Sequence, residues 1–458
     1  MIDISIVNGK IVTPNGIVSA GIGVENGTIV SIAKEPNLPA ADKTIDAKGK
    51  YVFPGIIDGH VHLANFGNPF LSDSRTESKA AAFGGVTTMG YQMITPSVME
   101  NFDKVKTTWN DNATVDMFCS LFLSSARNLD EIPKCPELGI TQFGEVGGYK
   151  GEQARMQNIL SADDGNIFRV LEMVSKMGYP ARLWIHCENV EIITMLQERL
   201  QKEGRTDAAA WSDSRPFFCE AEAIMRYAYY AEVTKCPLYI PHITTAEGLR
   251  TATSVMKKGK IDLVTETCPQ YLTHTKNDAI FKKDPPIANV NPPLRTKKDN
   301  EALWTGIKKG WIKTIGSDHA CMKRKQKSDS IWKAAMGVGF TTYTLPVLLS
   351  EGVHKRGLPL EKLVEICCFN PAKAYGLYPK KGTIEVGSDA DIVVVDIDKK
   401  VKARLEDTCS MYEFNIYEGW EFTGFPVLTM VRGSIVMEDG RVIGKEGTGK
   451  HIPVYLTK

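Results

Sequence analysis

Short β-type runs alternate with helical segments through most of this 458-residue chain. That alternation restricts the possible folds more than any other feature. The apolar spacing within 161–178 and 192–203 is typical of helices. Eight strand–helix units predict a (β/α)₈ barrel with a parallel sheet. A doubly wound sheet is the alternative, but it would normally carry a glycine-rich phosphate turn after its first strand. The predicted strands are 52–62, 86–92, 115–123, 140–146, 182–187, 238–244, 262–269 and 314–320.

The two ends of the chain differ from this central block. Residues 1–53 contain short strand-like runs separated by turn-forming Asn-Gly pairs. Similar runs with Gly-Ser and Asp-Gly turns recur near the other end, at 382–386, 390–396, 428–431 and 435–437. We therefore expect 1–53 plus 377–458 to form one composite β-sandwich, and 54–376 to form the barrel.

Composition excludes several classes of function. The chain has 55 basic and 54 acidic residues, so charge gives no support for nucleic-acid or membrane-surface binding. No apolar run reaches the length of a membrane span, and the N-terminus lacks the pattern of a signal peptide. The ten cysteines include no Cys-x-x-Cys pair, which suits buried thiols in a reducing compartment. We expect a cytoplasmic protein that acts on a small molecule.

Histidines gather at the predicted strand ends. His60 and His62 end the first strand and should point the same way, because side chains alternate along a strand. His186, His242 and Asp318 end the fifth, sixth and eighth strands. Each one alone is explained equally well as a hydrogen-bonded polar residue. Four of the chain's eight histidines at the ends of barrel strands, where catalytic residues lie, instead indicate one site.

Four imidazoles and a carboxylate suit zinc, with manganese, iron or cobalt as possible substitutes. A divalent metal with an open position makes hydroxide from water near neutral pH and polarises a carbonyl group. Asp318 would take the proton from that water and pass it to a leaving nitrogen. The pattern thus predicts a metal-dependent hydrolase.

Several longer segments carry a family resemblance, together with the order His-x-His, His, His and Asp. They include Ala-Ala-Ala-Phe-Gly-Gly-Val-Thr-Thr at 80–88, Ile-His-Cys-Glu-Asn at 185–189 and Glu-Thr-Cys-Pro-Gln-Tyr-Leu at 266–272. Asn-Pro-Pro-Leu-Arg at 291–295 and Gly-Ser-Asp-His at 316–319 belong with them. The chain resembles the amidohydrolase superfamily, and most of all its cyclic amidases: hydantoinase, dihydropyrimidinase, allantoinase and dihydroorotase.

The resemblance implies a barrel with a composite β-sandwich, one or two divalent metal ions, and ring-opening hydrolysis of a cyclic amide. It also implies a homo-oligomer, either a dimer or a tetramer. Tyr149 would donate its hydroxyl to the developing oxyanion, and Asn291 would contact the substrate ring through its main chain. The metal ligands would be His60, His62, His186, His242 and Asp318, with Asp318 also the proton shuttle.

Strand four departs from the family pattern. Relatives usually place there a carbamylated lysine that bridges two metals, whereas this chain has Gly144 followed by Glu145. Lys150 lies six residues further on, too far along an extended strand to replace it. Three interpretations remain. Glu145 bridges the metals if a bulge corrects its facing, the site holds one metal, or a register slip brings in Lys150.

The sequence restricts the choice of substrate less than it restricts the choice of site residues. Dihydroorotases usually follow His-x-His with Leu-Arg-Glu, whereas this chain continues Leu63-Ala64-Asn65, without an arginine for a substrate carboxylate. Segments 331–339 and 214–216 look more like those of allantoinases. We expect an uncharged cyclic ureide or imide, with allantoin, hydantoins and dihydropyrimidines in that order. A dihydroorotase, or a non-enzymatic scaffold related to dihydropyrimidinase, is the alternative.

Overall fold

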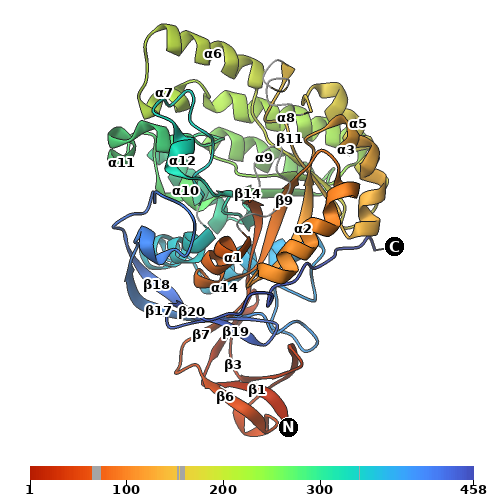
Figure 1. The fold of residues 1–458 in the computed structure, drawn as a ribbon, viewed down its shortest axis with the longest axis vertical. Helices are drawn as coiled ribbons and strands as arrows, with labels where there is room; N and C mark the ends of the chain where they lie inside the picture. Colours follow the sequence, from red (N-terminus) through yellow and green to blue (C-terminus); the bar gives the residue numbers. More distant parts are fainter. Residues whose placement is uncertain (64–73, 152–153, 155–159, 340, 458) are drawn as a thin grey trace.

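The computed structural model describes residues 1–63, 74–151, 154, 160–339 and 341–457. Its larger part is a barrel, in the upper half of Figure 1. The barrel strands are β8 (Ile56–His62), β9 (Val86–Ile94), β10 (Asp116–Phe122), β11 (Gln142–Val146), β12 (Arg182–Ile185), β13 (Leu238–Ile240), β14 (Leu263–Thr267), β15 (Thr314–Ile315) and β16 (His319–Ala320). β15 pairs with β14 and β16 pairs with β8, so these two short strands close the ring.

The predicted (β/α)₈ fold is confirmed. Every barrel pairing is parallel, and all nine residues of β9 and all seven of β10 are buried. Burial on both faces is expected, because helices cover the outside of the sheet while side chains fill the inside. Trp184 and Tyr239 stack inside with ring centroids 3.8 Å apart, and Tyr375 stacks against Trp184. These aromatic rings close the barrel interior.

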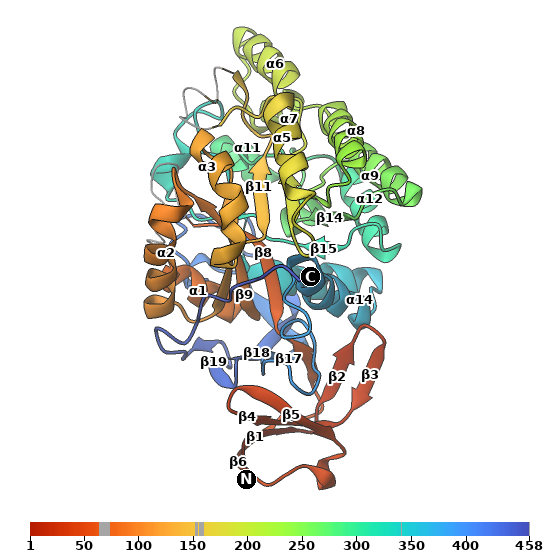
Figure 2. The ribbon, with the colours of Figure 1, turned by 90° about the vertical axis from the view of Figure 1, so that its right-hand side faces the viewer.

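Helices form the outer layer, as Figure 2 shows. Local sequence sets many of their starts: Asp163 and Thr245 accept hydrogen bonds from backbone N–H groups in the first turns of their helices. The helices are α1 (Ser74–Phe83), α2 (Val98–Asn112), α3 (Ala126–Glu131), α5 (Asp164–Val174), α6 (Val190–Lys202), α7 (Ala208–Asp213), α8 (Phe217–Thr234), α9 (Ala246–Lys258), α10 (Pro269–Thr273), α11 (Ala279–Lys283), α12 (Lys297–Lys308), α13 (Thr344–Val347), α14 (Leu360–Val364) and α15 (Asn370–Tyr375).

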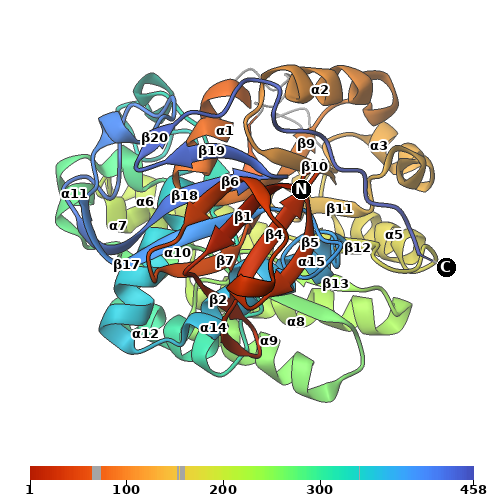
Figure 3. The same ribbon diagram turned by 90° about the horizontal axis from the view of Figure 1, so that it is seen from below.

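Strands from both chain ends form two further sheets, seen from below in Figure 3. They are β1 (Ile2–Val7), β2 (Lys10–Thr13), β3 (Gly16–Ser19), β4 (Gly21–Glu25), β5 (Thr28–Ala33), β6 (Ala41–Asp46), β7 (Tyr51–Pro54), β17 (Ile392–Lys402), β18 (Glu421–Val431), β19 (Ser434–Glu438) and β20 (Arg441–Val442). The sheet orders are β5-β4-β1-β6 and β20-β19-β18-β17-β7-β2-β3. β7 lies antiparallel to β17, with Val52 opposite Val394, so one sheet contains both ends of the chain.

Three of the expected strands differ. The run 314–320 forms two short strands, β15 and β16, in place of one. The run 52–62 is not one strand, because β7 belongs to the composite sheet and β8 to the barrel. Gly55 separates them, and a Cβ there would lie 2.0 Å from Thr87 Oγ1. The run 382–386 forms no strand either: Gly382 and Gly387 have φ of +77° and +96°, and Ser388 N–H closes a turn onto the carbonyl oxygen of Glu385.

A buried ionic cluster lies where the barrel meets the composite sheet. The Lys381 ammonium is 2.7 Å from Asp116 at the start of β10, 2.6 Å from Asp391 and 3.1 Å from Asp389. The Arg432 guanidinium adds a second cation, 2.9 Å from Asp116. The cluster therefore joins the barrel strand β10 to the residues just before β17 and just after β18.

All ten cysteines are free thiols, and eight of them are buried. Within the described residues, no helix has both the length and the apolar character needed to span a membrane.

Candidate metal centre

The structure brings the predicted polar residues together at the carboxyl ends of the barrel strands. His62, Glu145, His186 and Asp318 border a cavity of about 820 Å³. His60 and His62 project from β8, whereas Asp318 lies between β15 and β16. His186 follows the end of β12 directly, and His242 follows β13 by two residues. Residues far apart in sequence thus meet because parallel strands end at the same face of the barrel.

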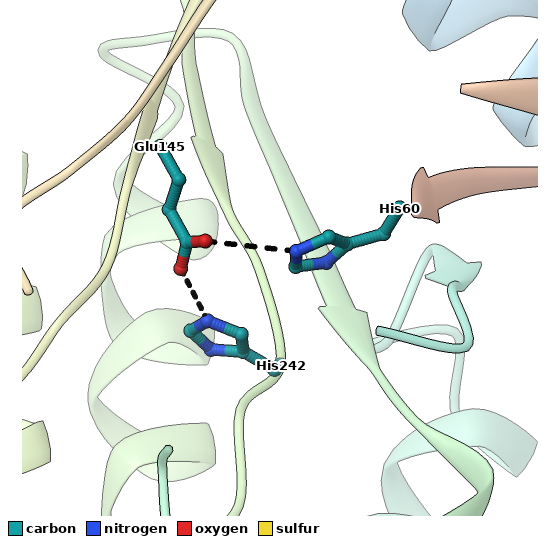
Figure 4. A group of neighbouring side chains, drawn as sticks. All are labelled: His60, Glu145 and His242. Carbon is teal, nitrogen blue, oxygen red and sulfur yellow. Dashed lines mark hydrogen bonds and ion pairs between the residues drawn. The ribbon is translucent and has the colours of Figure 1, made fainter. Parts of the chain in front are cut away.

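Glu145 lies between two histidine pairs. Its Oε1 is 3.0 Å from His186 Nδ1 and 2.5 Å from His242 Nε2. Its Oε2 faces the other pair, 3.6 Å from His60 Nε2 and 3.8 Å from His62 Nε2. Figure 4 shows one carboxylate oxygen of Glu145 directed at His60 and the other at His242. One carboxylate oxygen therefore points to each histidine pair, as a ligand bridging two cations would.

Asp318 completes the half of the cluster on the β8 side. Its Oδ1 is 3.3 Å from His62 Nε2 and 3.5 Å from His60 Nε2, and the two imidazole nitrogens are 3.1 Å apart. Ligand atoms of His60, His62 and Asp318 all lie within 4.8 Å of one another, and so do those of His60, Glu145 and His242. Both sets are compact enough to surround a metal ion with bonds of about 2 Å.

An irregularity in β11 turns Glu145 inward. The pairing of β11 with β12 shifts register between Phe143 and Val146. Gly144 makes this possible, because its φ is +116° and a Cβ would lie 2.2 Å from the carbonyl oxygen of Trp184. Strict alternation would have pointed Glu145 the other way. Strand four therefore contains the bulge that Glu145 needs in order to face the cluster.

Lys150 lies apart from the cluster. Its ammonium is 3.1 Å from the Glu191 carboxylate in α6, and the lysine side chain is partly exposed. This placement does not support the register slip that would bring Lys150 to the metal position.

Two carboxylates that the sequence reasoning did not select hold the outer sides of the imidazoles. Glu266 Oε1 is 2.8 Å from His60 Nδ1, and Glu188 Oε2 is 2.9 Å from His186 Nε2. A carboxylate only accepts hydrogen bonds, so with a metal bound each histidine would keep its proton on the nitrogen that faces Glu266 or Glu188 and would offer its other nitrogen to the metal. This arrangement is common around protein-bound metals, so the residues present fit a metal centre. The sequence offers one clue to each of these two carboxylates. Glu188 lies two residues beyond His186, and Glu266 is the first residue of a segment that resembles the family.

The ionisation of the carboxylates in the cluster also favours the binding of cations. Burial raises the pKa of Glu145, but the neighbouring His242, His186 and His60 outweigh it and hold that pKa well below its usual range. Burial likewise opposes ionisation of Asp318, whose pKa is lowered by His60 and His62. Burial lowers the pKa of His186, yet hydrogen bonds to Glu145 and Glu188 raise it to about 9. The cluster is therefore anionic in its carboxylates and attracts positive charge.

Tyr149 and Asn291 both line the cavity. Burial raises the pKa of Tyr149 to about 12, so its hydroxyl keeps its proton and can donate it in a hydrogen bond. The side-chain amide of Asn291 donates to Met336 Sδ, while its buried Oδ1 has no hydrogen-bond partner among the residues that the structure describes. Ala64 and Asn65, which entered the argument against a dihydroorotase, lie outside the described residues.

Two candidate ligands have uncommon backbone conformations. His242 has a φ of +36° and Asp318 has a φ of +53°. Side chains other than glycine rarely adopt positive φ, and such residues concentrate at functional sites. The surrounding structure thus holds both side chains in place at a conformational cost.

Comparison with known proteins agrees with this geometry. Residues 242–436 match the Amidohydrolase family. The chain is 34% identical to an L-hydantoinase of Paenarthrobacter aurescens, covering 99% of this chain and 98% of that protein. It is 32% identical to an allantoinase of Solibacter usitatus, covering 96% and 94%. A solved structure, an L-hydantoinase (dihydropyrimidinase) from Arthrobacter aurescens, matches with a TM-score of 0.91 at 32% identity, over 99% of this chain and 100% of that one.

Near full-length similarity to several enzymes of one kind, a matching fold and a family match over the C-terminal part all agree. The chain therefore belongs to the amidohydrolase family, and it is a cyclic amidase, an enzyme that hydrolyses carbon–nitrogen bonds in cyclic amides.

Proposed function

We propose that this enzyme opens the ring of an uncharged cyclic ureide or imide at a centre of two divalent metal ions. The observation that carries the proposal is the position of Glu145, with one carboxylate oxygen towards each histidine pair. Two close dications would repel strongly without an anion between them, and Glu145 would supply that anion. The proposed ligands are His60, His62, His186, His242, Asp318 and Glu145.

The donor set of four imidazoles and two carboxylates suits zinc best. When bound, the metal would supply Lewis acidity, which acidifies a water molecule and polarises the substrate carbonyl. Asp318 takes a proton from the attacking water at a carboxylate oxygen. As the water oxygen bonds to the carbonyl carbon and the ring C–N bond breaks, Asp318 returns that proton to the leaving nitrogen.

Tyr149 and Asn291 act on the substrate itself. The Tyr149 hydroxyl donates a hydrogen bond to the carbonyl oxygen as negative charge develops there. Its high pKa, about 12, keeps this donor protonated throughout the physiological range. Asn291 lies at the cavity wall, and its main chain orients the ring. These roles rest on the position of both residues in the cavity lining and on the family resemblance.

The cavity walls favour a hydantoin that carries an apolar substituent. Among the described lining residues, Lys333 is the one lysine or arginine, so a substrate carboxylate has no guanidinium partner there. An exocyclic phenyl group buried against such walls would gain about 2 kcal/mol, or roughly 30-fold in kcat/KM. Allantoin carries a polar ureido group instead and becomes the second candidate. The apolar walls include Ile94, Phe122, Trp211, Met322, Trp332 and Met336.

A substrate screen with metal analysis tests the proposal. Purified enzyme should contain two metal ions per chain and hydrolyse 5-benzylhydantoin at least ten times more efficiently than allantoin or dihydroorotate. Unsubstituted hydantoin and dihydrouracil serve as size controls. Preference for allantoin would refute the argument from the apolar walls. Preference for dihydroorotate would support the dihydroorotase alternative. Absence of stoichiometric metal would refute the proposed centre.

A further inference from the structure

We propose that a buried network of four charged side chains is a positioning device for one half of the metal centre, the half that contains His186 and His242. This network consists of Glu188, Arg215, Glu220 and Arg295. The inference rests on the proposed function, because it concerns how that centre is held. None of the four residues was selected as a site residue from the sequence, although three of them lie in segments that resemble the family.

The first link is the contact between Glu188 and His186. Glu188 Oε2 accepts a hydrogen bond from His186 Nε2 at 2.9 Å. The opposite nitrogen, Nδ1, lies 3.0 Å from Glu145 Oε1 and 3.2 Å from His242 Nε2. With a metal bound, Glu188 would hold the proton on Nε2, so that the Nδ1 lone pair would face the metal. Glu188 therefore sets both the tautomer and the orientation of this imidazole.

Two arginines hold Glu188 in place. Arg215 Nη1 is 2.6 Å from Glu188 Oε2, and the Arg215 guanidinium lies 4.5 Å from the centroid of the Trp211 ring. Arg295 Nη2 is 4.0 Å from Glu188 Oε1 and 3.6 Å from Glu220 Oε2. All four network residues are at least 92% buried. Buried charges are tolerated only when they are paired, so each member depends on the others.

The second link runs to the segment after His242. Glu220 accepts hydrogen bonds from the backbone N–H groups of Thr244 and Thr245, both at 3.1 Å. Arg295 Nε donates to Thr244 Oγ1 at 2.9 Å. These contacts hold the chain immediately beyond His242, which has the uncommon φ of +36°. The same network thus supports both histidines that face Glu145 Oε1.

The other half of the centre is supported differently. Glu266 contacts His60, and its second oxygen accepts a hydrogen bond from the Tyr239 hydroxyl at 2.7 Å. Within the described part of the chain, no lysine or arginine forms an ion pair with Glu266. The charged network therefore serves one half of the centre only. Disrupting it should weaken the metal at His186 and His242 and spare the metal at His60, His62 and Asp318.

Cobalt titration of metal-free enzyme tests this asymmetry. Wild type should bind two cobalt ions per chain, with two components in the visible spectrum. Glu188→Gln should weaken the site at His186 and His242 by about 10–100-fold, the usual cost of losing such a hydrogen-bonding partner. The first cobalt ion should bind as in wild type. Arg226→Met is the matched control, because Arg226 pairs with Asp164 and Glu222 and, among the described residues, forms no ion pair with a member of the network.

A double variant separates positioning from stability. Glu188→Gln leaves the buried Arg215 without its partner, which lowers the melting temperature. Glu188→Gln with Arg215→Met removes both charges and should recover much of that stability. If the network positions the ligands, the second cobalt site stays weak in the double variant. If its role is only structural, cobalt affinity returns with stability, and the proposal is overturned.

The outcomes also separate this inference from the proposed function. Wild type that binds no metal refutes the proposed centre, and the network role with it. Wild type that binds metal, together with Glu188→Gln that binds the same number with the same affinity, refutes the network role alone. Loss of one bound metal in Glu188→Gln, with a normal count in Arg226→Met, supports both.

Discussion

Replacing Lys381 with methionine should destabilise the protein by about 3–5 kcal/mol, the usual cost of removing one partner from a buried ion pair. The Lys381 ammonium lies within 3.1 Å of the Asp116, Asp389 and Asp391 carboxylates, and its side chain is 1% exposed. Methionine nearly preserves the shape of the lysine but leaves these carboxylates with Arg432, which pairs with Asp116, and Lys380, which pairs with Asp389, as their remaining close cations. The barrel and the composite sheet lose their shared charge compensation.

The expected change in melting temperature follows from the size of the protein. Unfolding entropy is about 2.1 cal/mol/K per residue, which gives roughly 1 kcal/mol/K for 458 residues. A loss of about 4 kcal/mol therefore lowers the midpoint by roughly 4 °C. Burial lowers the pKa of Lys381, but Asp391, Asp116 and Asp389 raise it above its usual range. This contribution is complete below the unfolded value of about 10.4, so the shift should be equal at pH 7 and pH 9.

Differential scanning calorimetry at both pH values measures the effect. Lys380→Met is the matched control, because the neighbouring Lys380 is 59% exposed and makes a solvent-accessible ion pair with the buried Asp389, 3.1 Å away. Such a pair contributes at most about 1 kcal/mol, so the control should melt within roughly 1 °C of wild type. A Lys381→Met protein that also melts within 1 °C of wild type would show that the cluster does not stabilise the fold.

Three further predictions concern the site. Elemental analysis should show that Glu145→Gln loses at least one bound metal. Lys150→Met, which breaks only the contact with Glu191, should keep the wild-type metal count. The reverse result would support the register slip. Asp318→Asn should keep its fold by circular dichroism but lose turnover by orders of magnitude, and near-normal turnover would rule out the proton shuttle. Tyr149→Phe should lower kcat by about 10²–10³-fold without moving the alkaline limb of the pH profile below pH 10, since the pKa of Tyr149 is about 12; an unchanged kcat would argue against the oxyanion role.

The barrel could be predicted from sequence because each strand is a short apolar run bounded by turns, and each helix has an apolar stripe of its own. In α5, Ile167, Val170, Leu171 and Val174 are buried at helical spacing. The sequence does not predict the break at Gly55, because an apolar run has the same pattern whether it stays in one sheet or passes from one sheet to another. The close approach of Gly55 to Thr87 is a tertiary contact that the run itself does not reveal.

The placement of the histidines and Asp318 followed from strand periodicity and barrel topology, but Glu145 required more. Alternation alone turned Glu145 away from the cluster. The irregularity that corrects it depends on Gly144 packing under the Trp184 carbonyl of the next strand. The buried network was also invisible from sequence, because Glu188 and Arg295 are far apart along the chain and each, taken alone, resembles an ordinary surface ion.

The pairing of β7 with β17 has a consequence for biosynthesis. Val52 can pair with Val394 only after roughly 340 further residues have been synthesised. At about 5–20 residues per second, the ribosome needs on the order of half a minute to supply the missing strand. During that time β7 exposes unpaired backbone groups and the apolar side chains that β17 will cover, while the barrel emerges. Completion of the composite sheet is therefore a late event that joins the oldest and newest parts of the nascent chain, and its early strands need protection from other nascent chains until then.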